Sequence, residues 1–329
     1  MKELLLRYAP YAKYAGVVGY PLFYAICLAI FASVTFPYDK LKQRIVASFN
    51  ADQLASGGQQ ELQIDAMTGR GLSGVRMSGI ALLGAPSEPG KPPTRLVVDG
   101  MTIHFSLLSM LVGSSDIDFD ADVWGGGARG EYATQGKDKS FDLSLDSVDL
   151  GKVGPLVQLL GVPVEGKLSG VMHMSMPEGR LSKGTGDVSL DAKGTAVGDG
   201  KAKLKGALAL PRIDVGTMTI AADVKDGVMK ITKFVASGRD VDVQGDGRIT
   251  LRDSVTESVC DMLLRFRIND AYRSKNDMTR SLFGVPGSNA PVLFELADPK
   301  IRQSKRADGF YGWSVRGALA RLDFFPAPR

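Results

Sequence analysis

Most of the chain alternates between hydrophobic and polar residues with a period of two. From Gln60 onward, apolar residues stand at every second position in a series of short runs. Successive side chains of a β-strand point to opposite faces, so this alternation predicts strands with one apolar and one polar face. The clearest runs are 62–66, 117–123, 141–145, 172–176, 218–224 and 264–268.

Glycine-containing dipeptides separate these predicted strands. Asp99-Gly100, Asp226-Gly227 and Asp246-Gly247 are typical of the two-residue turns of β-hairpins. Hairpins join antiparallel strands, so we expect a mainly β fold built on an antiparallel sheet with a few short helices. The longest helical candidate of this region is 270–283, which is followed by Gly284 and Pro286.

An uncharged segment lies near the N-terminus. Between Lys13 and Asp39 no residue carries a charge, and this stretch would extend roughly 37 Å as a helix, enough to cross a bilayer. Basic residues flank both sides in similar numbers, so the positive-inside rule alone does not decide the orientation. We expect an uncleaved transmembrane anchor with its N-terminus in the cytoplasm; a cleaved signal peptide is the alternative.

A second helix is predicted directly after this segment. Pro37 ends the uncharged run, and Asp39 can cap a helix whose apolar face contains Leu41, Ile45, Val46 and Phe49. Its basic residues would lie near lipid headgroups if the helix follows a membrane span, whereas a plain linker helix would pack on the domain below. These basic residues are Lys40, Lys42 and Arg44.

The predicted domain organisation follows from these boundaries. A cytoplasmic head and transmembrane helix occupy 1–37, a juxtamembrane helix and linker occupy 38–58, and a β-domain occupies 59–329. Two short apolar runs ending in glycine divide the β-domain into sub-modules at 59–150 and 151–329.

Composition and charge narrow the classes of function. The chain has 40 Lys+Arg and 36 Asp+Glu, and its formal net charge of +4 is too small to indicate a nucleic-acid partner. Two histidines and two cysteines are too few for a zinc finger or a disulfide framework. The excess of Lys and Arg over Asp and Glu lies at 262–329. These basic residues form either an ordinary solvated surface or a basic face that binds a partner or anionic headgroups.

Three segments match part of a known ligand-binding motif, but each lacks a residue or a neighbouring element that the motif requires. The glycines of 69–74 have dinucleotide-fingerprint spacing, but a strand pattern follows them, which favours a glycine-rich hairpin turn. The segment 161–167 fits a phosphate-binding loop until Leu168, which has no hydroxyl for magnesium. The alternating aspartates at 116–122 lack the glycine and glutamate of an EF-hand loop and fit one solvated strand face.

The sequence contains no recognisable catalytic group, so we expect no enzymatic activity, cofactor or metal ion. His104 and His173 lie in strand-like runs without a neighbouring nucleophile signature. The candidate binding surface is apolar instead, because curling the sheet would gather one apolar face into a trough; a closed, filled core is the alternative. The residues predicted to line the trough are Phe119, Val123, Leu143, Met172, Met174 and Met176.

Two stretches resemble the general secretion pathway protein N family (GspN) of the type II secretion system. They are TFPYDKLKQR at 35–44, directly after the uncharged segment, and GFYGWSVRG at 309–317. Two further stretches, 69–83 and 105–132, resemble AsmA-type proteins, and include the glycine cluster at 125–127. The AsmA resemblance implies a sheet that curves into an elongated trough. The secretion-family resemblance implies a single-pass protein of the bacterial inner membrane, with its β-domain in the periplasm.

Two functional hypotheses follow from these resemblances. The first is a non-catalytic component that assists protein export across the outer membrane, with other type II secretion subunits and the lipid bilayer as partners. The second is a lipid-binding or lipid-transfer module whose apolar trough takes acyl chains of phospholipid or lipopolysaccharide. Neither hypothesis involves a nucleic acid.

Overall fold

The computed structural model describes most of the chain. The described residues are 19–21, 23–24, 27–28, 30–31, 34–55, 60–71, 73–84, 95–106, 109, 114–154, 156, 162–201, 203–204, 208–209, 211–288 and 292–328. Those between 19 and 35 are helical, and no described helix combines the length and apolar character that a bilayer crossing needs. Part of the predicted membrane segment lies outside the described ranges, so the transmembrane helix stays a prediction.

One antiparallel sheet of fourteen strands dominates the structure. Its strands follow one another in chain order, and among the strands that the structure describes, only the short β9 (Lys203–Leu204) and β10 (Leu208–Ala209) pair separately. The strands of the sheet are β1 (Glu61–Arg70), β2 (Gly74–Leu83), β3 (Arg95–Phe105), β4 (Ser114–Val123), β5 (Gly126–Gln135), β6 (Asp138–Asp149), β7 (Val164–Met176), β8 (Thr185–Val197), β11 (Ile213–Lys225), β12 (Val228–Ser237), β13 (Val241–Thr250), β14 (Val259–Ile268), β15 (Tyr311–Ala318) and β16 (Arg321–Pro326). The predicted mainly β fold with an antiparallel sheet is confirmed, and each of the six clearest alternating runs lies in one of these strands.

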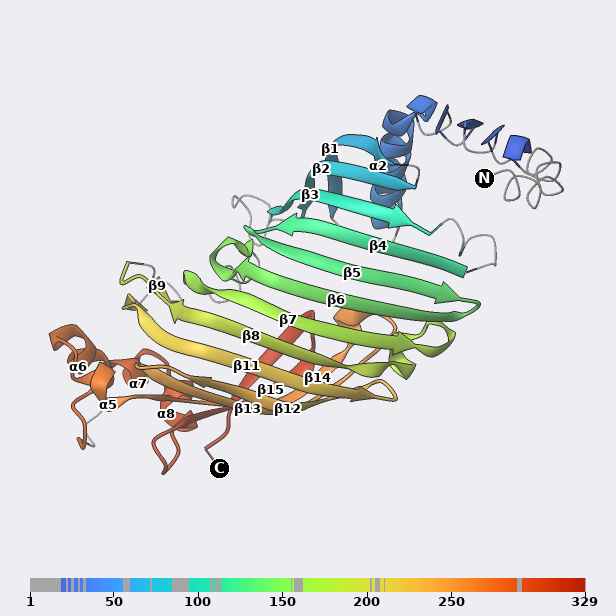
Figure 1. Cartoon of the computed structure of the whole chain (residues 1–329). Helices are drawn as coiled ribbons and strands as arrows, with labels where there is room; N and C mark the ends of the chain where they lie inside the picture. The colour runs from blue at the N-terminus through green and yellow to red at the C-terminus, as the bar shows by residue number, and fades with distance from the viewer. Residues whose placement is uncertain are drawn as a thin grey trace, which may run out of the picture.

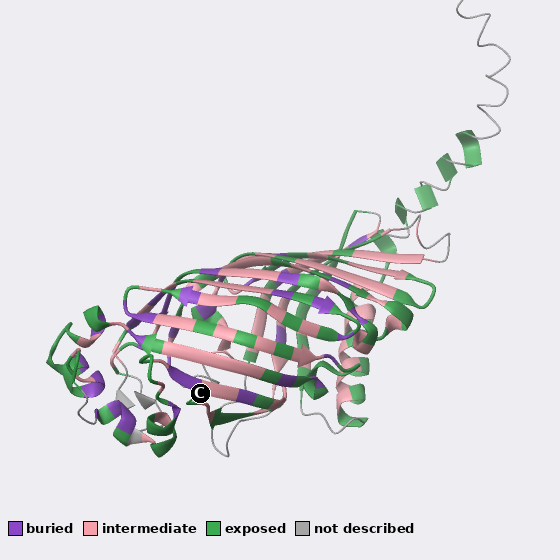
Figure 2. Ribbon diagram, turned by 90° about the horizontal axis from the view of Figure 1, so that it is seen from below, coloured by how far each residue is buried: buried purple, intermediate pink, exposed green. Residues whose placement is uncertain are grey.

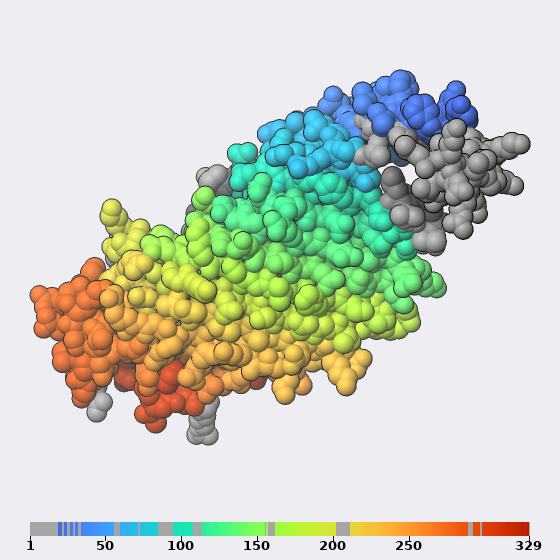
Figure 3. Space-filling view, viewed as in Figure 1, coloured from blue at the N-terminus to red at the C-terminus, as the bar shows by residue number. Residues whose placement is uncertain are grey.

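The sheet is open and curls between its two edge strands, β1 and β16. In Figure 1 the late strands β14 and β15 pass behind β7, β8 and β11, and Figure 2 shows the curl from below. The first strands and the C-terminal helices lie at opposite ends of the molecular surface (Figure 3). The expected sub-module boundary at 150/151 falls between β6 and β7, which pair within the same sheet.

The helix that follows the N-terminal segment is attached to the first edge strand. This helix, α2 (Tyr38–Ala55), places Asn50 beside β1, where its Oδ1 accepts a hydrogen bond from the Leu62 N–H at 2.8 Å. Lys42 Nζ donates to the Asp65 carbonyl oxygen at 2.9 Å. The chain between the N-terminal segment and the sheet is therefore held against β1. Four single-turn 3₁₀ helices lie further along the described chain, in connections between strands: η1 (Leu150–Lys152), η2 (Pro177–Gly179), η3 (Leu181–Lys183) and η4 (Val255–Glu257).

The largest core lies where four short helices meet the sheet. These helices, inserted between β14 and β15, are α5 (Asp270–Arg273), α6 (Asp277–Phe283), α7 (Leu293–Ala297) and α8 (Pro299–Ser304). Phe294 of α7 packs among the rings of Phe266, Phe283 and Tyr311, with centroid distances of 6.4, 5.3 and 5.6 Å. Tyr272 of α5 is fully buried and donates from its hydroxyl to the Pro211 carbonyl oxygen at 3.0 Å. These contacts close one end of the sheet.

The predicted helix at 270–283 is two helices in the structure. The break precedes Asn276, whose side chain accepts from the Thr279 N–H at 2.8 Å, while Thr279 Oγ1 accepts from the Asn276 N–H at 3.1 Å. This reciprocal capping box starts α6 afresh, because it supplies partners to N–H groups that have none within the helix. The predicted C-terminus is correct, since Gly284 follows α6 with a φ of 77°.

Of the three predicted hairpin dipeptides, only Asp226-Gly227 forms a turn. It joins β11 to β12 with φ values of 49° and 73°, as a two-residue hairpin requires. Asp99-Gly100 lies inside β3, where the pairing with β4 shifts register by one residue. Asp246-Gly247 lies inside β13, and a Cβ at Gly247 would stand 2.6 Å from the Met262 Cα. These two glycines permit a bulge and a close strand approach, so the prediction of turns there is wrong.

Candidate functional site

The strand register aligns apolar residues from almost the whole sheet into one row. Each member is the direct cross-strand partner of the next, and every member is apolar or glycine. At about 4.8 Å per strand, the row extends over roughly 58 Å of sheet. It comprises Val75, Ile103, Phe119, Gly130, Leu143, Met172, Val188, Ala222, Ile231, Gly247, Met262, Val315 and Phe324. We call the surface that carries this row the apolar face.

The six predicted trough residues all lie on the apolar face. Phe119, Leu143 and Met172 belong to the row itself and are half-buried. Val123 is 8% exposed and Met174 is 7% exposed. Met176, at the end of β7, packs beside Met174 in a small cluster with Val224 and Leu251. The structure therefore brings these residues onto one surface, with the larger side chains still accessible to solvent.

A glycine shapes the centre of this surface. Gly130 stands between Phe119 and Leu143 in the row, and a Cβ built on it would lie 2.4 Å from the Phe119 ring. The missing side chain leaves room for the Phe119 ring to lie over β5. The ring also stacks near Phe141 of β6, with a centroid distance of 6.2 Å and an interplanar angle of 16°. The result is a pair of nearly parallel aromatic rings on the apolar face.

The opposite face carries a row of ionisable residues in the same strand register. It runs through twelve strands and comprises His104, Asp118, Glu131, Asp142, His173, Asp187, Asp223, Lys230, Arg248, Asp261, Arg316 and Asp323. Sequence reasoning predicted single polar residues on strand faces but missed this row, because only the register shows which of them are neighbours. Ionisable side chains need contact with water, so this face of the sheet must be solvated. A shift of the strand register by one residue would bring them onto the apolar face, which disfavours such a shift.

Within this row, His173 and Asp142 form a close pair. Their Nδ1 and Oδ1 atoms are 2.5 Å apart, and both side chains are about half exposed. The hydrogen bond to Asp142 raises the pKa of His173 above its usual 6.5, and the charge of Asp187 on β8 acts in the same direction. The pair therefore stabilises the folded protein while the imidazole is protonated, and this contribution disappears as the pH rises through the raised pKa.

We expect Asp142→Asn to lower the pKa of His173, because the amide cannot stabilise the imidazolium as a carboxylate does. An NMR titration of the His173 ring measures this pKa directly. Asp146→Asn, on the same strand and the same face, is the matched control and removes a carboxylate that makes no contact with His173 in the row. An unchanged His173 pKa in Asp142→Asn would contradict the assignment of the pair.

The three predicted membrane-surface residues have different environments. Lys40 and Arg44 are exposed on α2, whereas Lys42 contacts Asp39 and the backbone of β1. Lys40 and Arg44 therefore remain the candidates for a contact with headgroups. Lys42 instead helps to fix α2 on the sheet.

The three segments that partly match ligand-binding motifs form hairpin and strand structure, as the sequence predicted. The glycines of 69–74 surround the β1–β2 hairpin connection, and the segment before Leu168 leads into β7. Asp118, Asp120 and Asp122 are exposed on the face of β4 opposite Phe119. Among the residues that the structure describes, no group of three or more His, Cys, Asp or Glu residues is arranged to hold a metal ion.

Comparison with known proteins adds no family to this description. No protein-family model, curated protein or solved structure matches the chain. The function is therefore argued from the sheet itself.

Proposed function

We propose that the chain is a non-catalytic, inner-membrane-anchored protein whose apolar face forms a periplasmic trough for acyl chains. The observation that carries this proposal is the uninterrupted apolar row through thirteen strands of an open sheet. The four helices α5–α8 pack only near one end of the strands, so Phe119, Leu143 and Met172 keep part of their surface. Acyl chains of phospholipid or lipopolysaccharide are ligands of the matching chemistry.

The energetics of such a ligand are favourable. Burying a methylene contributes about 0.8 kcal/mol, so ten methylenes contribute on the order of 8 kcal/mol before the costs of binding. Methionine side chains adapt to irregular apolar ligands, and Met172, Met174 and Met176 lie side by side along β7. An accessible apolar surface of this extent also needs a cover, since soluble proteins rarely expose large contiguous apolar patches.

Photocrosslinking tests this proposal. The full-length protein is expressed in bacterial membranes that contain a phospholipid with a photoreactive acyl chain, and the labelled peptides are identified by mass spectrometry. We expect labels on β4–β8, in addition to any on the N-terminal segment. Labels restricted to the N-terminal segment would mean that lipid only surrounds an anchor, and would exclude the trough.

Two adjacent residues on opposite faces give a matched pair of variants. Met172→Glu places a carboxylate on the apolar face, where an acyl chain cannot solvate it, and we expect labelling of the sheet to fall roughly tenfold. Val171→Glu places the same carboxylate on the opposite face, which carries the row of ionisable residues. Val171 is already 39% exposed there, so this variant should leave labelling unchanged. Equal labelling in the two variants would contradict a ligand on the apolar face.

A second candidate function is that of a component that assists type II secretion through contacts with other subunits. The feature that favours it is the edge strand β16, which is the last strand of the sheet and exposes Phe324 and Phe325 at 46% and 51%. An edge strand can pair with a strand of a partner through its backbone groups. A clean deletion that leaves exoprotein secretion at its normal level would exclude this function without affecting the acyl-chain proposal.

A further inference from the structure

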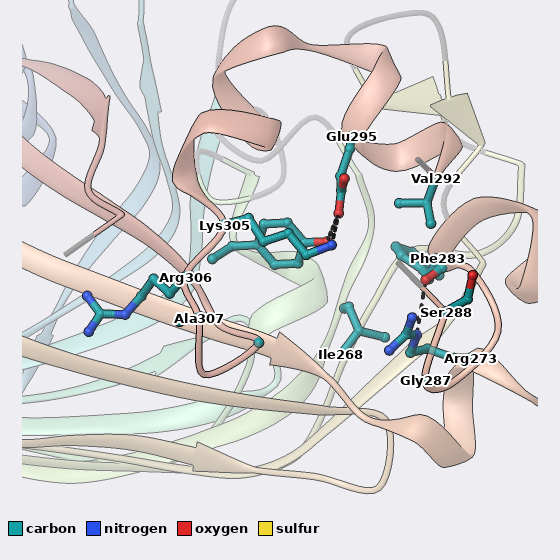
Figure 4. A pocket seen from close by; sticks show the side chains of 12 residues that line it. Ile268, Arg273, Phe283, Gly287, Ser288, Val292, Glu295, Lys305, Arg306 and Ala307 are labelled. Atoms are coloured by element: carbon teal, nitrogen blue, oxygen red, sulfur yellow. Dashed lines mark hydrogen bonds and ion pairs between the residues drawn. The ribbon is translucent and has the colours of Figure 1, made fainter. Parts of the chain in front are cut away.

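A cavity of about 390 Å³ lies between the four C-terminal helices and the ends of β14 and β15. This size is within the range of small-molecule sites, roughly 300–1,000 Å³. One wall is apolar and consists of Ile268, Phe283 and Val292 with the ring of Tyr311. Figure 4 shows the charged side chains on two sides of the cavity, with Lys305 and Glu295 on one side and Arg273 on the other.

The single carboxylate of the cavity already has its partners. Glu295 is 6% exposed, and its Oε1 accepts from Lys305 Nζ at 2.7 Å and from the Tyr311 hydroxyl at 2.9 Å. Burial raises the pKa of Tyr311, so this hydroxyl stays protonated and keeps donating. The charge of Glu295 is therefore compensated within the protein.

The charge of Arg273 is compensated much less. Its Nε and Nη2 donate to the carbonyl oxygens of Phe283 and Val285, at 3.0 and 3.2 Å, and these are neutral groups. Its carboxylate contact is Asp270, at 3.4 Å, whose side chain is 73% exposed to solvent. Exposed ion pairs of this kind contribute little. In Figure 4 Arg306 points its guanidinium away from Lys305, Glu295 and Arg273, so Arg273 is the arginine that supplies weakly compensated positive charge to the cavity.

We propose that this cavity binds a phosphate group that carries a short apolar substituent. The anion would approach Arg273, with Lys305 on the opposite wall, while the substituent would contact Ile268, Phe283 and Val292. Such a group can belong to an anionic lipid or to a free small molecule. The proposal does not depend on the acyl-chain ligand, because it rests on the charged side chains that line this cavity and not on the row of apolar residues.

Isothermal titration calorimetry with the full-length protein in amphipol tests the proposal. The probes are hexyl phosphate, inorganic phosphate and hexanol. We expect saturable binding of hexyl phosphate to one site and no saturable binding of hexanol. Inorganic phosphate binding roughly tenfold more weakly would identify the headgroup of a lipid-like molecule as the ligand, whereas equal affinity would identify the free anion.

Two variants with opposite expected effects make the test specific to charge. Arg273→Gln removes the weakly compensated cation and should weaken hexyl phosphate binding at least roughly tenfold. Glu295→Gln removes the carboxylate, leaves an amide to bond Tyr311, and frees Lys305 for the ligand, so affinity should rise several-fold. Arg280→Gln on α6, an exposed arginine paired with Asp277, is the matched control and should have no effect.

The outcomes that overturn the proposal are equally clear. Absence of saturable binding for both phosphate probes would exclude an anion site in the wild-type protein. If Glu295→Gln weakens binding as Arg273→Gln does, while both variants keep the wild-type melting temperature, then the charges act through structure and the anion assignment is wrong. An effect of Arg280→Gln as large as that of Arg273→Gln would also contradict it, since a general surface attraction would then explain the binding.

Discussion

Replacing Phe294 by alanine is expected to lower the free energy of unfolding by about 3–5 kcal/mol, the usual cost of truncating a buried phenylalanine. Phe294 is 7% exposed and contacts three other aromatic rings from β14, α6 and β15. Helix α7 has only five residues, so it is held by tertiary contacts and not by its own hydrogen bonds. Removing the ring therefore leaves a cavity and weakens the attachment of the helices to the sheet.

The preceding residue provides the control for this prediction. Leu293 lies on the same helix and is 51% exposed, so Leu293→Ala should change stability by no more than about 0.5 kcal/mol. Urea denaturation of the full-length protein in a non-ionic detergent measures both variants, and comparison of the slopes shows whether the unfolding reaction is the same. Similar effects of the two substitutions would mean that the aromatic cluster is not a core.

The sequence was sufficient to predict the type of sheet and the face of each candidate residue. Alternation assigns a side chain to a face without knowledge of its neighbours, which is why Phe119, Leu143 and Met172 were placed on one surface correctly. The same reasoning assigned Asp118 and Asp120 to the opposite, solvated face.

The features that depend on register could not be predicted. A two-residue signal such as Asp246-Gly247 is the same whether the glycine turns the chain or lets Met262 approach closely, and only the partner strand decides. The row of ionisable residues opposite the apolar face could not be predicted for the same reason, since the distance in sequence between its members varies from strand to strand. The register is set by the lengths of the loops between strands and by bulges within strands, and neither has a simple sequence pattern.

The cavity at the C-terminal end was missed for a related reason. Arg273 and Glu295 lie on the short helices α5 and α7, Lys305 directly follows α8, and no motif links the three in the sequence. The positive surplus at 262–329 indicated a basic region but not which cation has only an exposed partner. That distinction requires the contacts of Glu295 with Lys305 and Tyr311, which arise only when the helices pack on the sheet.

Gly130→Ala is expected to destabilise the protein by about 2 kcal/mol, within the range typical of overpacked positions. The new Cβ would stand 2.4 Å from the Phe119 ring and 2.5 Å from the Asp142 carbonyl oxygen. The ring can rotate away, but the carbonyl belongs to the backbone of β6, so the strands must also separate. Gly127→Ala, on the same strand, meets no atom within 4 Å and should be nearly neutral.

A second substitution separates the two causes of this effect. Phe119→Leu in the Gly130→Ala background removes the contact with the ring and leaves the contact with the Asp142 carbonyl, so stability should recover only in part. A double-mutant cycle from thermal or urea denaturation gives the coupling, which we expect to be about 1 kcal/mol for residues in direct contact. Full recovery would assign the whole loss of stability to the contact with the ring, and no recovery would assign it to the contact with the backbone.

The ring of Phe119 covers Gly130 at the centre of the apolar face. Gly130→Ala should therefore also reduce photolabelling of β4–β8, which would connect the shape of this surface with the binding of the proposed ligand.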